Sequence, residues 1–288
     1  MPLDIAGGYG DLIKKHGFVP ANHEKPNFFD VTLQPIFDSK GKIIPGYQRV
    51  QNEANGASLA VHSENYRIIP YRETFEKFDN AIIQSGLDTT DMLVATDMTH
   101  DGARCFRQYL FPSVTISVGG KDLALRIISF NSYDGSYAMS FMAGFYVFVC
   151  ANMSVLGTDL IKLKMKHVGD VETKFEDGAT RVALAGSLFV SSRDRLQKWA
   201  EIKVGPHTFA HLIDTCMPQS TERLCNELVA GYATSQEPKT LWSAYNVLTA
   251  WSTHTETTRK GYPQARALRE RRVAACIEGA EWKALEAA

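Results

Sequence analysis

Basic side chains alternate with apolar ones just past the middle of the chain. The basic members of this run are Lys162, Lys164, Lys166 and His167. Successive side chains of a strand point to opposite faces, so one face of this strand would carry the positive charges. Such a row is able to contact the phosphates of a nucleic acid. An ordinary solvated strand face is the alternative.

Aromatic residues are dense in the segment before this lysine row. They are Tyr137, Phe141, Phe145, Tyr146 and Phe148. Aromatic rings beside basic groups suit single-stranded nucleic acid, because bases stack on the rings. Most of these rings are nevertheless expected in the core.

A second basic cluster occupies residues 259–272, where Glu270 is the only acid. On a helix, Arg259, Arg266 and Arg269 would share a face, and that helix could contact phosphates. A solubilising surface helix is the alternative. We select Arg266, Arg269 and Arg272 as candidate phosphate contacts from this cluster.

Carboxylates and one imidazole gather in residues 91–101: Asp91, Asp97, His100 and Asp101. Oxygen and nitrogen ligands of this kind can hold Mg²⁺ or Mn²⁺ for phosphodiester chemistry. Their spacing fits no nuclease motif, and a polar loop after a strand is the alternative. We therefore predict no metal and no cofactor, and keep a nuclease using Asp97, His100 and Asp101 as a third hypothesis.

The cysteines predict reduced thiols rather than disulfides or a zinc site. Their number is odd and none has Cys-x-x-Cys spacing; they are Cys105, Cys150, Cys216, Cys225 and Cys276. A nucleophilic Cys150 would need a base, for which His167 is the nearest candidate in sequence. The chain also lacks the P-loop, dinucleotide-binding, zinc-protease and hydrolase motifs, so a non-enzymatic protein is favoured.

Residues 131–136 read Asn-Ser-Tyr-Asp-Gly-Ser. Asn, Asp and Gly are turn formers, so a plain hairpin turn is expected. A ligand loop is the alternative, because an amide, an aromatic face and a carboxylate would lie together at a strand end. Tyr133 is our candidate for a stacking contact with a base.

The order of predicted strands and helices indicates an α+β protein, with an antiparallel β-meander in the N-terminal and middle part packed with a helical C-terminal part. Residues 1–45 are rich in Gly, Pro and Asn and predict an irregular N-terminal segment with one or two short strands. Residues 46–180 predict a mainly antiparallel β core. Residues 181–288 predict helices packed on that core.

Within the core, apolar spacings of three and four predict a helix over 73–85, ended by Gly86. Strict alternation in 114–118, followed by Gly119-Gly120, predicts a hairpin with 123–130. Further strands are expected at 92–96, 104–111, 137–141 and 145–149. In the helical part, Leu184, Leu188 and Trp199 should line one helix, Pro238 should start another, and a final helix should run from Pro263 to the terminus.

Several motifs together resemble a known family. Residues 63–70 (Ser-Glu-Asn-Tyr-Arg-Ile-Ile-Pro), the turn at 131–136, Cys150-Ala151-Asn152, and a Leu-Trp-Ser-Ala-Tyr-Asn helix at 241–246 leading to His254 carry the likeness. The chain resembles, over about residues 57–275, a phage/plasmid-like protein family catalogued as domain of unknown function 932. Relatives usually have an Arg before the Cys and a Gly after the Asn. Here those places hold Phe148 or Val147, and Met153.

The resemblance implies a phage or mobile-element setting, among DNA-repair, recombination and anti-restriction genes, without supplying an activity.

The chain has 288 residues and a formal net charge of -1, so nucleic-acid binding would need a local basic patch. It lacks a signal-peptide pattern and any apolar run near the ~20 residues of a membrane helix, which predicts a cytoplasmic location without membrane contact.

The first hypothesis is a non-enzymatic nucleic-acid-binding protein of phage or mobile-element DNA metabolism, with single strands favoured and homo-oligomers expected by analogy with annealing proteins. The second is a protein-binding inhibitor or decoy against a host defence factor, which needs an exposed apolar or acidic patch. The metal-dependent nuclease is the third.

Overall fold

The computed structural model describes residues 10, 16–147, 152–155, 163–165, 178–217, 220–255 and 262–288. The strands are β1 (Val19–Pro20), β2 (Val31–Phe37), β3 (Ile43–Asn52), β4 (Ser58–Ser63), β5 (Leu93–Thr99), β6 (Arg104–Val118), β7 (Lys121–Ser132), β8 (Met139–Val147), β9 (Asn152–Val155) and β10 (Leu163–Met165). The helices are the short η2 (Ala21–His23), α2 (Tyr71–Gln84), α3 (Gly178–Glu201), α4 (Pro206–Cys216), α5 (Glu222–Thr234), α6 (Leu241–His254), α7 (Tyr262–Ile277) and α8 (Ala280–Ala287). Strands precede most of the helices, which confirms the α+β class.

The main sheet has seven strands in the order β1-β5-β6-β7-β8-β10, with β9 also paired to β8. Its pairs are antiparallel, and β5 to β8 form the predicted meander. The turn at 131–136 joins β7 to β8, as expected. At the other end, Gly119 and Gly120 have φ values of 55° and 75°. Two consecutive positive φ values suit a tight hairpin, and glycine adopts them without a Cβ clash.

Two strands are longer than predicted. Residues 104–118 form the single strand β6, whose pairing with β7 shifts register between Phe111 and Thr115. Pro112 lies in this irregular stretch and has no N–H to give to a ladder, which explains a local break without an end to the strand. Residues 139–147 likewise form one strand, β8, where the sequence predicted two.

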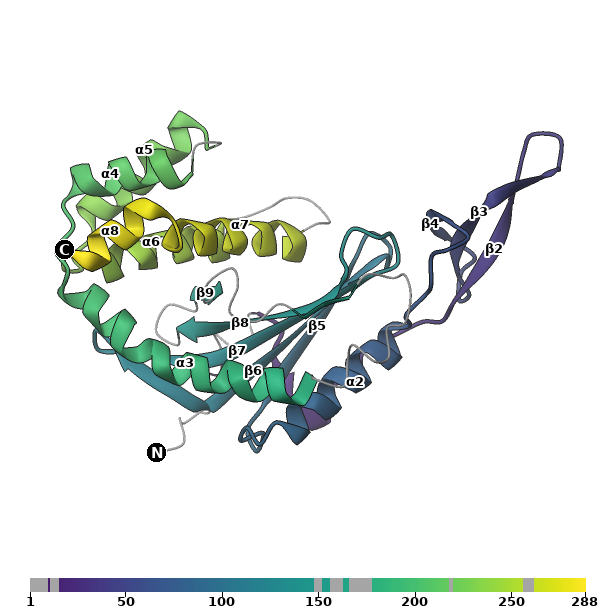
Figure 1. Cartoon of the computed structure of the whole chain (residues 1–288), viewed down its shortest axis with the longest axis horizontal. Coiled ribbons are helices and arrows are strands. Elements are labelled where there is room, and N and C mark those ends of the chain that lie inside the picture. Colours follow the sequence, from purple (N-terminus) through teal and green to yellow (C-terminus); the bar gives the residue numbers. More distant parts are fainter. Residues whose placement is uncertain are drawn as a thin grey trace.

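Helices lie on both sides of the sheet (Figure 1). Helices α2 and α3 cover one face, called the α2 face, and bury apolar side chains there, including Phe75, Phe78 and Phe189. Helix α7 lies over the other face, called the α7 face. Helix α2 ends near its predicted boundary, with Gly86 at φ 78° just beyond it.

The helical part differs from the prediction at three places. Leu184 is 48% exposed, and Val182, Ala185 and Phe189 face the core from α3 instead. Pro238 precedes α6, which Thr240 caps by accepting a hydrogen bond from the Ser243 N–H. The C-terminal helix is broken at Gly279, so α7 and α8 are separate.

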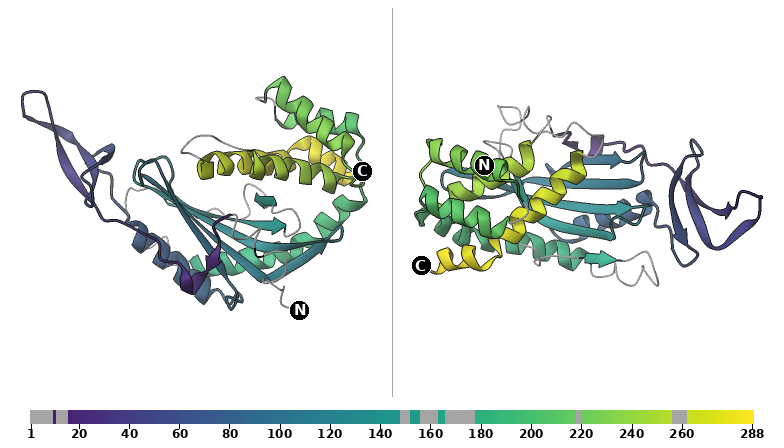
Figure 2. Two further views of the ribbon diagram at one scale, coloured as in Figure 1. Left: turned by 180° about the vertical axis from the view of Figure 1, so that it is seen from behind. Right: turned by 90° about the horizontal axis from the view of Figure 1, so that it is seen from above.

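Strands β2, β3 and β4 form a second, three-stranded antiparallel sheet that projects from the body (Figures 1 and 2). We call residues 31–63 the arm. The segment expected to be irregular, residues 1–45, contributes β2 and the start of β3 to this sheet. Its pairing includes Gln34 with Arg49, Arg49 with Val61, and Tyr47 with Ser63.

Candidate functional site

One residue of the predicted lysine row, Lys164, lies at an edge of the main sheet. Strand β10 pairs with β8, and Lys164 lies opposite Ser140. On the next strands, Ser140 is paired with Phe130, Phe130 with Phe106, and Phe106 with Asp97. Lys162, Lys166, His167 and Cys150 lie outside the described residues. Lys164 is therefore the one member of the row whose backbone position is known.

The arginines of α7 serve mainly internal contacts. Arg266 is 5% exposed, and its Nε lies 3.6 Å from Glu270 Oε1. Arg269 donates hydrogen bonds to the carbonyl oxygens of Ser252 and Thr255, at 2.9 and 3.2 Å. Those carbonyls lie at the C-terminal end of α6, where a cation is favourable. Of the three predicted phosphate contacts on this helix, Arg272 alone is exposed.

Beneath α7, Glu270 meets a second arginine from the sheet. Arg126 Nη1 lies 3.0 Å from Glu270 Oε2, and both side chains are 1% exposed. The same guanidinium donates to the Gln108 side-chain oxygen at 3.0 and 2.6 Å. A buried charge needs a paired and hydrogen-bonded environment of this kind. The cluster anchors α7 to the sheet and is poorly placed to receive a ligand.

Two further features of the α7 face surround this cluster. Asp97 is largely removed from water, and burial raises its pKa although Arg266 acts against the shift. Arg271 lies over the rings of Phe130 and Tyr137, at 5.3 and 5.7 Å from the ring centres. Its guanidinium therefore makes cation–π contacts within the protein.

The turn at 131–136 is built into the structure by its own side chains. The Asn131 amide donates to the Ile69 carbonyl at 3.0 Å and to Thr74 Oγ1 at 2.7 Å. Tyr133 is 0% exposed, and its ring stacks on Tyr71 at 3.9 Å between centres. Its hydroxyl oxygen also accepts the Tyr71 N–H at 3.0 Å, while burial raises the pKa of that hydroxyl. In this conformation Tyr133 offers no ring face to a base.

The same turn also attaches the arm to the main sheet. His62, on β4, places Nε2 2.8 Å from the Tyr133 carbonyl oxygen, and the Tyr66 hydroxyl donates to the Ser132 carbonyl at 3.1 Å. Asp134 forms an ion pair with Arg104 at 2.5 Å. Burial opposes ionisation of Asp134, but hydrogen bonds from the Ser136 N–H and from Arg104 hold its pKa below the usual range. The turn thus connects β4, the segment between β4 and α2, and the start of β6.

The acids and imidazole of the third hypothesis are not brought together. His100 and Asp101 are exposed at the β5–β6 turn, whereas Asp97 lies on the α7 face of β5. Arg104 Nη1 lies 3.2 Å from His100 Nε2, and a guanidinium can only donate, so in this structure the lone pair of this nitrogen accepts a hydrogen bond. Within the described ranges, no group of three His, Cys, Asp or Glu side chains is placed to hold a metal ion.

The arm presents the surface that the sequence did not reveal. Phe37 and Tyr47 are each 55% exposed, and no other aromatic side chain that the structure describes is classed as exposed. By cross-strand register Tyr47, Arg49 and Val61 share one face of the arm, which we call the outward face. Gln34 is paired with Arg49 and lies on that face too. The alternation of Tyr47, Arg49 and Gln51 could have predicted this face. It was missed because the preceding residues are rich in Pro and Gly, which favoured an irregular segment.

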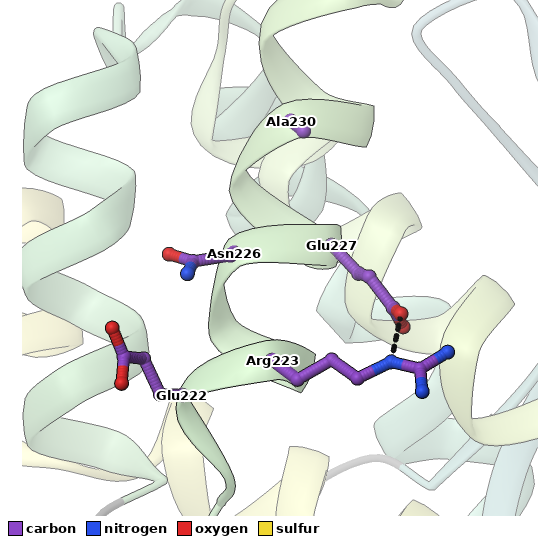
Figure 3. Close-up of a pocket in the computed structure, with 5 residues that line it drawn as sticks. All are labelled: Glu222, Arg223, Asn226, Glu227 and Ala230. Carbon is purple, nitrogen blue, oxygen red and sulfur yellow. Dashed lines mark hydrogen bonds and ion pairs between the residues drawn. The ribbon is translucent and has the colours of Figure 1, made fainter.

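A shallow hollow follows the exposed side of α5 (Figure 3). Its side chains come from one helix: Glu222, Arg223, Asn226, Glu227 and Ala230. Arg223 Nε donates to Glu227 at 2.8 Å, an (i, i+4) pair that is common on solvated helices. Among the described residues, no side chain from a second element lines this hollow, so it is an ordinary helix surface. In the part of the chain that the structure describes, no helix is both long and apolar enough to span a bilayer.

Comparison with known proteins places the chain in a family. No curated protein and no solved structure matches it. Residues 58–274 match the model of the family described as Domain of unknown function (DUF932). The match includes the turn at 131–136 and the 241–246 helix that carried the resemblance; β2 and β3 precede it. Because the match covers most of its length, the chain belongs to the DUF932 family.

Proposed function

We propose that the protein is a non-enzymatic nucleic-acid-binding protein, and that it takes single strands on the outward face of its arm. The observation that carries this proposal is the 55% exposure of Tyr47, which shares the outward face with Arg49. Phe37, also 55% exposed, lies at the end of β2. An exposed ring on a sheet is able to stack on a base of any sequence. Burial of Tyr133 moves the proposed stacking contact from the turn at 131–136 to the arm.

Polar groups on the outward face add hydrogen-bonding capacity. Arg49 Nη2 donates to Gln51 Oε1 at 2.9 Å, which orients the guanidinium along the strand. Gln51 Nε2 in turn donates to the Gly56 carbonyl at 3.2 Å, and Gln34, paired with Arg49, adds an amide to the same face. Such groups suit base edges and phosphates when a strand lies along the sheet.

Phosphate contacts would come from lysines at the arm tip. Lys40 and Lys42 are exposed there, and their backbone N–H groups donate to Asp38 Oδ1 at 2.8 and 2.9 Å. These bonds fix the hairpin turn and leave the lysine side chains to solvent. Lys164 at the sheet edge and Arg272 on α7 remain additional proposed contacts, as do Lys162, Lys166 and His167, which lie outside the described residues. A cytoplasmic protein of phage or mobile-element DNA metabolism, assembled as a homo-oligomer, is the setting we propose.

A second candidate is a protein-binding inhibitor or decoy, for which the arm also supplies an observation. Exposed apolar side chains concentrate on the arm: Leu33, Phe37, Ile43, Ile44, Tyr47 and Val61. Contiguous exposed apolar surface commonly marks a protein interface. This candidate uses the apolar side chains and needs no contribution from Arg49 or the lysines.

Binding of the full chain to labelled single- and double-stranded DNA and RNA, over a salt series with and without Mg²⁺, separates the two candidates. We expect salt-sensitive binding to single strands, without cleavage. Tyr47→Ala should weaken that binding by about 1–3 kcal/mol. Ile83→Ala, which removes an exposed apolar side chain of α2, is the matched control and should leave it unchanged.

Absence of binding even at low salt would refute the nucleic-acid proposal and favour a protein partner. Equal losses of single-strand affinity in Tyr47→Ala and Ile83→Ala would show that the arm is not the binding surface. Cleavage that requires Mg²⁺ and disappears in Asp97→Ala would instead support the nuclease.

A further inference from the structure

Two cysteines that are 60 residues apart in sequence meet beside the junction of α7 and α8. Cys216 is the last residue of α4, and Cys276 lies in the last turn of α7. Cys216 Sγ lies 3.8 Å from the Cys276 carbonyl oxygen. Both residues are free thiols. The helices α4 and α7 therefore present a thiol pair that the sequence spacing did not reveal.

Backbone packing holds this pair in place. The Gly279 N–H donates to the Cys276 carbonyl oxygen at 3.0 Å and closes the end of α7. A Cβ added at Gly279 would lie 3.1 Å from that oxygen and 3.8 Å from Cys216 Sγ. The junction of α7 and α8 thus places the Gly279 backbone next to the sulfur of Cys216, on the side of the Cys276 carbonyl.

The two thiols differ in their surroundings. Cys276 is 1% exposed, whereas Cys216 is half-buried and in reach of solvent. A hydrogen bond from the Cys276 side chain lowers the pKa of Cys216 to about 7, although burial opposes the shift. The same hydrogen bond, together with burial, raises the pKa of Cys276. Cys216 is then the thiol of the pair that loses its proton more readily, and the thiolate is the reactive form.

We propose that Cys216 and Cys276 are an oxidation site that a hydroperoxide converts to a disulfide, with Cys216 as the attacking thiol and Cys276 as the resolving thiol. The Cys216 thiolate attacks one peroxide oxygen; an S–O bond forms, the O–O bond breaks, and the leaving oxygen takes a proton to become water or an alcohol. The Cys276 sulfur then attacks the sulfenic sulfur. An S–S bond forms, the S–O bond breaks, and the departing hydroxide takes the Cys276 proton as water.

The consequence for the fold is a covalent tie between α4 and α7. Helix α7 carries Glu270 onto the sheet, so the tie would hold this helix and the α4–α5 pair together. A cross-link that closes a long loop restricts the unfolded chain and raises thermal stability. This site is separate from the arm and does not depend on the proposed function.

Peptide mapping of the full chain tests the proposal. The reduced protein is treated with hydrogen peroxide at a low molar excess, digested without reductant, and analysed by mass spectrometry. We expect a linked peptide pair containing Cys216 and Cys276, about 2 Da lighter than the two thiol peptides. The melting temperature should rise, and dithiothreitol should reverse both changes. This map uses the wild-type chain, so it needs no variant to fold.

Three variants assign the roles. Cys216→Ser should leave Cys276 reduced, because the buried thiol does not react first. Cys276→Ser should leave Cys216 as a sulfenic acid that dimedone traps. Cys225→Ser, which removes the half-buried thiol of α5, should keep the link. Further oxidation of Cys216 with Cys276 still reduced, or linkage of Cys216 to any other cysteine, would overturn the proposal.

Discussion

The arm and helix α7 both combine groups that suit nucleic acid, yet the fold directs them oppositely. On α7, Arg266 and Arg269 turn toward the protein, and Arg271 lies over internal rings. On the arm, Tyr47 and Phe37 point to solvent. The more basic segment is thus the less available one. Residue type alone does not decide which surface can meet a ligand.

The physical reason is the packing of each element. Helix α7 lies across a sheet face that already contains Arg126 and Asp97. A charged side chain on the buried side of α7 loses its water there, and it is stable only when it is paired or hydrogen-bonded within the protein. The arm packs only its base against the body, where Val50 is 0% exposed. Its outward face has no layer above it among the described residues. This contrast between α7 and the arm can be tested by mutation.

Removal of the carboxylate beneath α7 has the largest expected effect. Glu270→Ala deletes the partner that lies 3.0 Å from Arg126 Nη1 and leaves a buried guanidinium without its counter-charge. We expect the free energy of unfolding to fall by about 3–5 kcal/mol in chemical denaturation. Arg272→Ala, at an exposed position of the same helix, is the control and should change it by less than ~0.5 kcal/mol. Similar losses in both variants would contradict the internal role of α7.

Arg269→Ala has the next largest expected effect. It removes two charge-assisted hydrogen bonds, at 2.9 and 3.2 Å, from the carbonyls at the end of α6. The free energy of unfolding should fall by roughly 1.5–3 kcal/mol, measured in the same way. If stability is unchanged while binding to single strands is lost, Arg269 is a phosphate contact and the contrast with the arm fails.

Asp97→Asn should produce a smaller, pH-dependent gain. Burial raises the pKa of Asp97 in the folded state, so the folded protein holds this proton more tightly than the unfolded chain. The contribution of this group to stability is complete below the ordinary aspartate pKa and is lost as pH rises through the raised value. Thermal denaturation should therefore show a more stable Asp97→Asn variant at neutral pH and no difference in acid. A gain that persists below the ordinary aspartate pKa would show that ionisation is not its cause.

Tyr47→Ala has the smallest expected effect on stability. Its side chain is 55% exposed, so the free energy of unfolding should change by less than ~0.5 kcal/mol. Tyr133→Ala is the matched comparison, because this tyrosine is 0% exposed and stacked on Tyr71. It should cost about 3–5 kcal/mol. A large loss in Tyr47→Ala would show that the arm is a structural element.

Much of the fold could be predicted because it follows from neighbours along the chain. The hairpin at Gly119-Gly120 and the end of α2 near Gly86 depend on local φ preferences. The hairpin turn at 131–136 was predicted for the same reason. Its role in joining the arm to the sheet was not, because His62 and Tyr66 reach it from far along the chain.

The α+β order, the meander and the family follow from the amino-acid sequence. The exposure of the candidate residues does not, because it depends on the packing of distant elements: Tyr133 and Arg266 are buried, Arg269 bonds the end of α6, and Tyr47 is exposed. It also brought Cys216 to Cys276 across 60 residues. The reason is that turns and caps depend on a few adjacent residues, whereas burial and charge pairing depend on which distant elements pack together.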